Sequence, residues 1–87
     1  MEVEQIKQTL RDHIVKEYGV RANDPEFNDD VHLFDYGYID SFGAVDLISF
    51  VQASFGVQVS QADLVAYPLN TISEISTFVS LRKRGEL

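Results

Sequence analysis

Residues 33–42 read LFDYGYIDSF and residues 43–56 continue GAVDLISFVQASFG, a glycine-bearing loop that runs into a helical pattern. Asp40 and Ser41 are residue types that cap helix N-termini, and Gly56 is typical of a helix C-terminus. Apolar residues recur between them at three- and four-residue steps, as on one face of a helix. These residues are Ala44, Leu47, Ile48, Val51 and Phe55. The stretch therefore predicts a helix that begins sharply at Asp40 or Ser41 and ends at Gly56.

The residues before this stretch predict an amphipathic helix and then a long loop. The helical stripe is Val3, Ile6, Leu10, Ile14 and Tyr18, and Gly19 is the expected stop. From residue 20 to residue 40 the periodicity is lost, and Asn, Asp, Pro and Gly interrupt the chain. Loops of this length are uncommon in a small domain and tend to be functional or to carry a short helical turn. Its apolar residues are expected to pin it onto the core, namely Val31, Leu33, Phe34 and Ile39.

The residues after this stretch predict two more helices. Residues 57–59 form an extended link, and residues 60–63 (SQAD) are close to a capping box that opens a short helix ending before Pro68. Residues 71–74 (TISE) are a full capping-box pattern for the last helix. Its apolar face is Ile72, Ile75, Phe78, Val79 and Leu81. The fold predicted is an all-α bundle of three long helices and one short one with a long first loop. We expect one domain over residues 1–81 and a short basic tail over residues 82–87, whose cations suit a helix C-terminus.

Composition and charge exclude several classes of function. The 87-residue chain has no cysteine, which excludes disulfides, thiolate metal sites and cysteine nucleophiles. It has no apolar run long enough for a membrane span and no leader-like N-terminus, so we expect a cytoplasmic protein. The net charge is −7, and residues 22–81 contain nine acids but no Lys or Arg. Such a surface repels nucleic acid and attracts basic proteins.

The polar residues allow two interpretations, one catalytic and one metal-binding. Ser41, His32 and Asp40 supply the residue types of a hydrolytic triad, but no nucleophile elbow surrounds the serine and so small a bundle offers little room for a cleft. His13 is expected at the edge of the first helix's apolar stripe. The cluster Asp29, Asp30 and Asp35 suggests calcium, but no register has the glycine and glutamate that an EF-hand loop requires. We therefore expect a solvated acidic loop, no metal site and no enzyme.

The pair Asp40-Ser41 places a hydroxyl at the positive end of a helix, exposed at a loop junction. Free backbone N–H groups and the helix dipole would stabilise a phosphodiester formed there. The same pair also has an ordinary reading as an N-cap with no further role. The residue pattern by itself leaves both readings open.

The chain resembles the acyl and peptidyl carrier proteins from the first helix to Val79. The resemblance lies in Asp40-Ser41, in residues 45–48 (VDLI) and in residues 55–60 (FGVQVS). It implies that Ser41 receives 4′-phosphopantetheine from coenzyme A, and that the thiol of this arm holds acyl or aminoacyl cargo as a thioester. It also implies a monomer with three kinds of partner: a phosphopantetheinyl transferase, an acyl- or aminoacyl-loading ligase, and downstream synthase enzymes.

The attachment sequence departs from the usual family pattern. Gly37 lies three residues before Asp40, Tyr38 fills the usual glycine position, and Phe42 follows the serine. This spacing is more similar to D-alanyl carrier proteins and to free-standing carriers of natural-product pathways. Fatty-acid-type carriers have glutamates on the second helix, where Asp46 is here the only acid after Ser41.

Partner recognition is therefore expected to involve Asp40, Phe42 and Asp46, with Phe50 as a further apolar contact. Phe42 itself is either a core residue or such a contact. The resemblance favours a carrier for polyketide, peptide or other specialised biosynthesis. The alternative is an unmodified carrier-like module that only docks to a partner.

Overall fold

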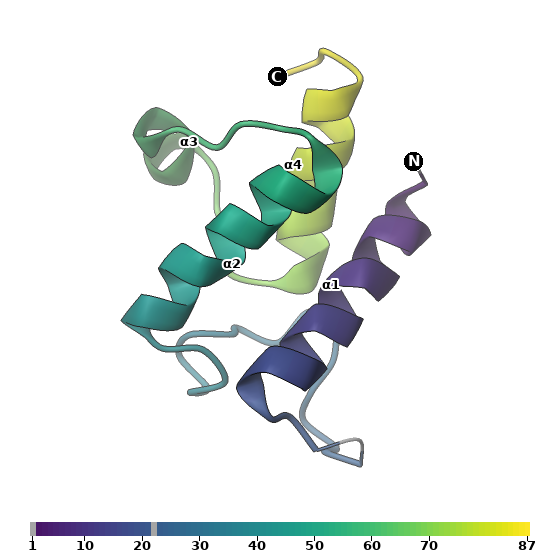
Figure 1. Cartoon of the computed structure of the whole chain (residues 1–87), viewed down its shortest axis with the longest axis vertical. Coiled ribbons are helices and arrows are strands. Elements are labelled where there is room, and N and C mark those ends of the chain that lie inside the picture. The colour runs from purple at the N-terminus through teal and green to yellow at the C-terminus, as the bar shows by residue number, and fades with distance from the viewer. Residues whose placement is uncertain (1, 22) are drawn as a thin grey trace.

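The computed structural model describes residues 2–21 and 23–87, and within these residues it contains four α-helices and no strand. The helices are α1 (Val3–Tyr18), α2 (Ser41–Phe55), α3 (Gln61–Ala66) and α4 (Ile72–Lys83). α1 and α4 pack together, whereas the short α3 stands to one side of α2 (Figure 1). The predicted all-α bundle is therefore confirmed. None of these helices, over the described ranges, is long and apolar enough to cross a membrane.

The three long helices and the first loop share one hydrophobic core. Its helical members are Ile6, Leu10, Ile14, Leu47, Val51, Phe55, Ile72, Ile75, Phe78 and Val79. The predicted pinning of the loop is confirmed, because Val31, Leu33 and Ile39 are buried and Phe34 packs against them. Val3 is the exception in the first predicted stripe, since it is exposed at the start of α1. α3 contributes no buried residue.

Side-chain caps begin the two last helices. Ser60 and Asp63 form a reciprocal capping box at α3, in which each side chain accepts the other residue's backbone N–H. At α4 only half of the predicted box forms. The Thr71 hydroxyl accepts from the Glu74 N–H at 3.0 Å, but the Glu74 carboxylate accepts from the Asn70 N–H at 3.0 Å instead of that of Thr71. The Glu74 side chain therefore binds the backbone of Asn70, in the link before α4, and not that of Thr71, the capping residue of α4.

Asp29 fastens the first loop to two helices. The guanidinium of Arg11 in α1 donates two hydrogen bonds to its carboxylate, each 2.7 Å long. Its backbone carbonyl accepts from the N–H of Ser73 in the first turn of α4 at 3.0 Å. The hydrogen bonds from Arg11 hold the pKa of Asp29 below its usual value. The loop that leads to α2 is thus tied down at its middle.

The first two cations of the expected tail belong to the last turn of α4. Arg82 donates to the Asp63 carboxylate of α3 at 2.7 Å, and its guanidinium lies 5.0 Å from the centre of the Phe78 ring. Lys83 donates to the carbonyl of Phe55, the last residue of α2, at 2.8 Å. A cation at that position offsets the negative end of the α2 dipole.

Candidate functional site

Ser41 is the first residue of α2, and its side chain is exposed. Asp40 is the N-cap of this helix, and its carboxylate accepts from the Gly43 N–H at 2.8 Å. The Asp40 carbonyl accepts from the Ala44 N–H at 2.9 Å, which starts the helical hydrogen-bond ladder. The serine hydroxyl therefore stands at the positive end of a helix of 15 residues, in the turn whose first N–H groups have no partner within the helix.

A close approach of three segments lies behind the serine at Gly43. The hydroxyl of Tyr18, the last residue of α1, donates to the Gly43 carbonyl at 3.0 Å. A β-carbon on Gly43 would lie 2.9 Å from Cε1 of Tyr18 and 2.8 Å from Cγ2 of Ile39. Only glycine therefore lets α1, the loop and α2 meet at this distance. The sequence did not indicate that Tyr18 or Gly43 belongs to the site, although a glycine inside a helical pattern is a signal for such a close contact.

The surroundings of the serine are acidic. Asp40 and Asp46 are both exposed, and no Lys or Arg occurs from residue 22 to residue 81. Burial raises the pKa of Tyr18, and the carboxylates of Asp46, Glu17 and Asp40 raise it further. The phenol therefore stays protonated at neutral pH and can donate its hydrogen bond. A basic partner would be attracted to this end of α2.

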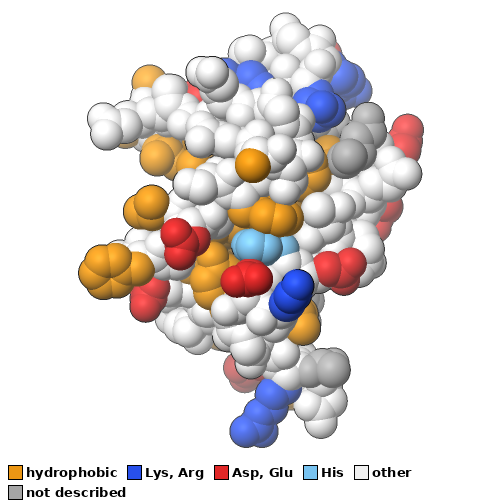
Figure 2. Space-filling view, viewed as in Figure 1, with side chains coloured by type: hydrophobic (Ala, Val, Ile, Leu, Met, Phe, Trp, Pro, Cys, Tyr) orange, Lys and Arg blue, Asp and Glu red, His pale blue; other side chains and the backbone are white. Residues whose placement is uncertain are grey.

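Apolar side chains are also exposed on α2 near the serine and on the neighbouring α3. Phe42 is 84% exposed and Val45 is 67% exposed, and Val65 on α3 is 90% exposed. Figure 2 shows apolar side chains along the edge that α2 and α3 form in this view. The reading of Phe42 as a core residue is therefore wrong. Phe50 differs, because it is half-buried and its ring stacks on that of His13 with centroids 3.6 Å apart.

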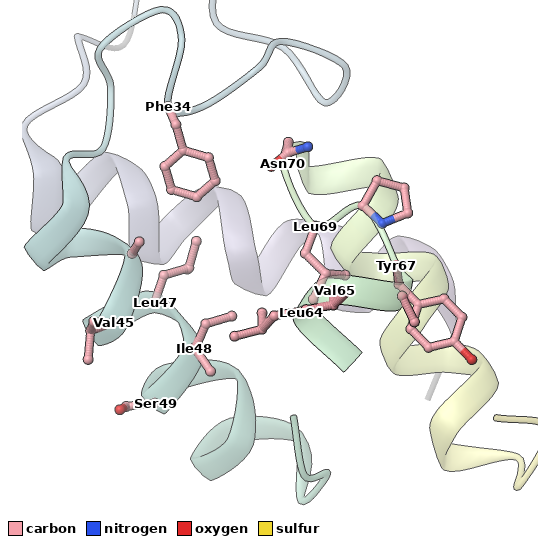
Figure 3. A pocket seen from close by; sticks show the side chains of 13 residues that line it. Phe34, Val45, Leu47, Ile48, Ser49, Leu64, Val65, Tyr67, Leu69 and Asn70 are labelled. Carbon is pink, nitrogen blue, oxygen red and sulfur yellow. The ribbon is translucent and has the colours of Figure 1, made fainter. Parts of the chain in front are cut away.

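An apolar groove separates α2 from α3. Its volume is about 680 Å³. It is lined mainly by apolar side chains, including Phe34, Val45, Leu47, Ile48, Leu64 and Val65. Figure 3 shows Ile48 of α2 and Leu64 of α3 facing each other across the groove, with Phe34 at one end. The groove starts at Ala44, one turn after Ser41, so that it continues the surface on which the serine lies.

The structure does not assemble the catalytic triad or the calcium site that the polar residues suggested. The Nδ1 of His32 accepts from the Asp35 N–H at 3.0 Å, and the Asp40 carboxylate serves as a helix cap, so neither is arranged around Ser41 as a triad requires. Asp29, of the acidic loop cluster, binds Arg11 instead of its neighbours. Over the described part of the chain, His, Asp and Glu side chains form no group of three that could hold a metal ion.

His13 lies where α1 meets α2, consistent with its expected place at the edge of the stripe. Its ring lies against Phe50 and meets the Tyr18 ring edge-on with centroids 6.0 Å apart. Burial in this contact lowers the pKa of His13.

A family model described as "Phosphopantetheine attachment site" matches residues 8–79, which include all of α2, α3 and the first loop. The chain belongs to this family. Domains of the family are carriers rather than catalysts, and they interact with phosphopantetheinyl transferases and biosynthetic enzymes. They carry covalently attached 4′-phosphopantetheine, which is the cofactor of this carrier domain. No match was found with a curated protein.

The residues of this carrier domain suit that group. An attachment residue needs a hydroxyl that a second protein can reach, and Ser41 is exposed at the positive end of α2. The apolar groove beside α2 offers a surface for the uncharged parts of an arm or its cargo. The chain itself needs no thiol, because the arm supplies one.

Proposed function

We propose that this carrier domain is modified on Ser41 and serves polyketide, peptide or other specialised biosynthesis. The observation that carries the proposal is the exposed hydroxyl of Ser41 at the capped N-terminus of α2, inside the family match. When attached, the arm supplies a thiol that holds an acyl or aminoacyl group as a thioester. The part of this chain is to present one hydroxyl and a surface that partner enzymes bind.

In the attachment step, the Ser41 oxygen forms a bond to a phosphorus of the coenzyme A pyrophosphate. The bond from that phosphorus to the bridging oxygen breaks, and adenosine 3′,5′-bisphosphate leaves. The hydroxyl proton passes to a base of the transferase, while the Asp40 carboxylate keeps its role as the cap that accepts from the Gly43 N–H. The transferase would also supply the metal ion. Ser41 thus acts as an acceptor and not as a catalyst.

The exposed surface of α2 supports a specialised pathway over bulk fatty-acid synthesis. Phe42 and Val45 are largely exposed, and Asp46 is the only acid of the helix itself. Partners would then bind by apolar contact together with a few charge pairs, rather than through a row of carboxylates. The spacing of Gly37 before Asp40-Ser41 supports a likeness to D-alanyl-type carriers.

Intact-mass measurement after incubation with coenzyme A and a broad-specificity phosphopantetheinyl transferase tests the attachment site. We expect the wild-type chain to gain one phosphopantetheine group and Ser41→Ala to gain none, with an unchanged helical circular dichroism spectrum. Ser54→Ala is the matched control, because Ser54 is another exposed serine on α2. It should be modified like the wild type. A gain that survives in Ser41→Ala would show that the site is elsewhere.

The same measurement separates the carrier from an unmodified interaction module, since such a module gains no mass in the wild type. If the mass is gained, offering the arm-bearing form, with its thiol free, to acyl- and aminoacyl-activating ligases in turn identifies the cargo class. Efficient loading by fatty-acid enzymes alone would contradict the specialised pathway.

A further inference from the structure

Both backbone polar groups of Gly43 form hydrogen bonds with residues outside α2, namely its capping residue and the last residue of α1. Its N–H donates to the Asp40 carboxylate at 2.8 Å, and its carbonyl accepts from the Tyr18 hydroxyl at 3.0 Å. Ser41 lies in the same turn, between the capping residue and this glycine. The orientation of the serine relative to α1 therefore depends on a turn that is held from both ends.

The Tyr18 side chain is itself held in place. It lies at the end of α1 directly before Gly19, whose left-handed φ of 67° turns the chain away from the helix. Its ring meets the His13 ring edge-on. Cε1 of the ring occupies the space that a side chain at position 43 would need. The ring makes packing contacts, and the hydroxyl makes the hydrogen bond to α2.

From this geometry we propose that Tyr18 is a positioning residue for attachment, whose hydroxyl holds the first turn of α2 so that Ser41 is presented in the orientation that the transferase requires. The inference rests on Ser41 being the attachment site. Tyr18 is half-buried and its hydroxyl donates to the Gly43 carbonyl and not to Ser41, so it acts through Gly43. Such a residue should affect the transfer step more than the binding of the transferase, because it contributes little to the exposed surface.

The test compares Tyr18→Phe with the wild type in steady-state modification by the same transferase with coenzyme A. The substitution keeps the ring in its contact and removes only the hydrogen bond. Ser76→Ala is the control, because it also removes a single hydroxyl, one that donates to the Ile72 carbonyl within α4 at 2.7 Å and not to α2. Thermal unfolding of each variant is followed in parallel, and rates are measured well below every midpoint.

We expect Tyr18→Phe to lower kcat about three- to tenfold, the loss that one hydrogen bond makes possible, with KM for the carrier unchanged. Ser76→Ala should leave both constants at the wild-type values. Equal kcat in Tyr18→Phe and wild type overturns the inference, even if the variant melts earlier, and so does an equal loss of kcat in both variants. A raised KM at unchanged kcat overturns it too, since Tyr18 would then belong to the docking surface. If the wild type gains no mass at all, the proposed modification itself is wrong, and if Ser41→Ala still gains mass, the attachment site is wrong, so both failures are distinguished from a failure of the role of Tyr18.

Discussion

The pair of Arg11 and Asp29 should couple more strongly than an ordinary surface ion pair. Two hydrogen bonds of 2.7 Å join the guanidinium to the carboxylate, and the side chains are only 28% and 21% exposed. Hydrogen bonds to charged groups contribute about 1.5–3 kcal/mol when protected from water, and partial exposure reduces this. We expect a coupling free energy of about 1–2 kcal/mol for the pair.

A double-mutant cycle of Arg11→Met and Asp29→Asn measures this coupling, with the free energy of unfolding taken from urea titrations. The pair Arg84 and Glu86 is the control, because its atoms approach to 3.0 Å but its side chains are 64% and 56% exposed. Its cycle of Arg84→Met and Glu86→Gln should give a coupling of about 0–0.5 kcal/mol. A coupling for Arg11 and Asp29 no larger than that of the control would refute the reasoning.

The same pair has a consequence for the pH dependence of stability. The hydrogen bonds from Arg11 lower the pKa of Asp29 in the folded chain below its unfolded value. Its contribution is therefore complete above the unfolded pKa, at about pH 4, and is lost as the pH falls through the lower folded pKa. Asp29→Asn lacks this contribution, so its difference in unfolding free energy from the wild type should shrink in acid. A difference that stays constant from pH 7 to acid would contradict the role assigned to the carboxylate.

Three further predictions concern other contacts of the site. Gly43→Ala should lower the unfolding free energy by about 1–2 kcal/mol, because overpacking against Tyr18 outweighs the gain in helix propensity; a stabilised variant in urea titration would show that the contact can relax. Phe42→Leu should leave the melting temperature nearly unchanged while shifting the relative modification rates with two different transferases, and unchanged rates would remove its recognition role. Burial lowers the pKa of His13 in the folded chain, so its contribution to stability is complete above the unfolded pKa of 6.5 and is lost as the pH falls through the folded pKa. In urea titrations between pH 8 and pH 5, the unfolding free energy of His13→Phe should therefore fall less steeply than that of the wild type. Parallel curves for the two would exclude this contribution.

The limits of the helices could be predicted because their signals are local. Asp40 and Gly56 bound α2 through contacts within one turn, and the apolar spacing between them identifies the buried face. The place of Ser41 at the start of this helix follows from the same signals. The loop could be placed on the core for a related reason, since its few apolar residues had nowhere else to be buried.

The contacts that complete the site could not be predicted in this way. The partners Tyr18 and Gly43 are 25 residues apart, and Arg82 and Asp63 are 19 apart, so no local pattern connects them. The local pattern also did not show that the carboxylate of Glu74 accepts from the N–H of Asn70 and not from that of Thr71.

The sequence by itself therefore determined the helices, their order, the acidic surface and the serine at the start of α2. Tertiary structure alone decided which residues hold that serine's turn and which apolar side chains stay exposed beside it. The physical reason is that capping and periodicity act within a few residues, whereas the approach of α1 to Gly43 and the groove between α2 and α3 depend on how whole helices pack.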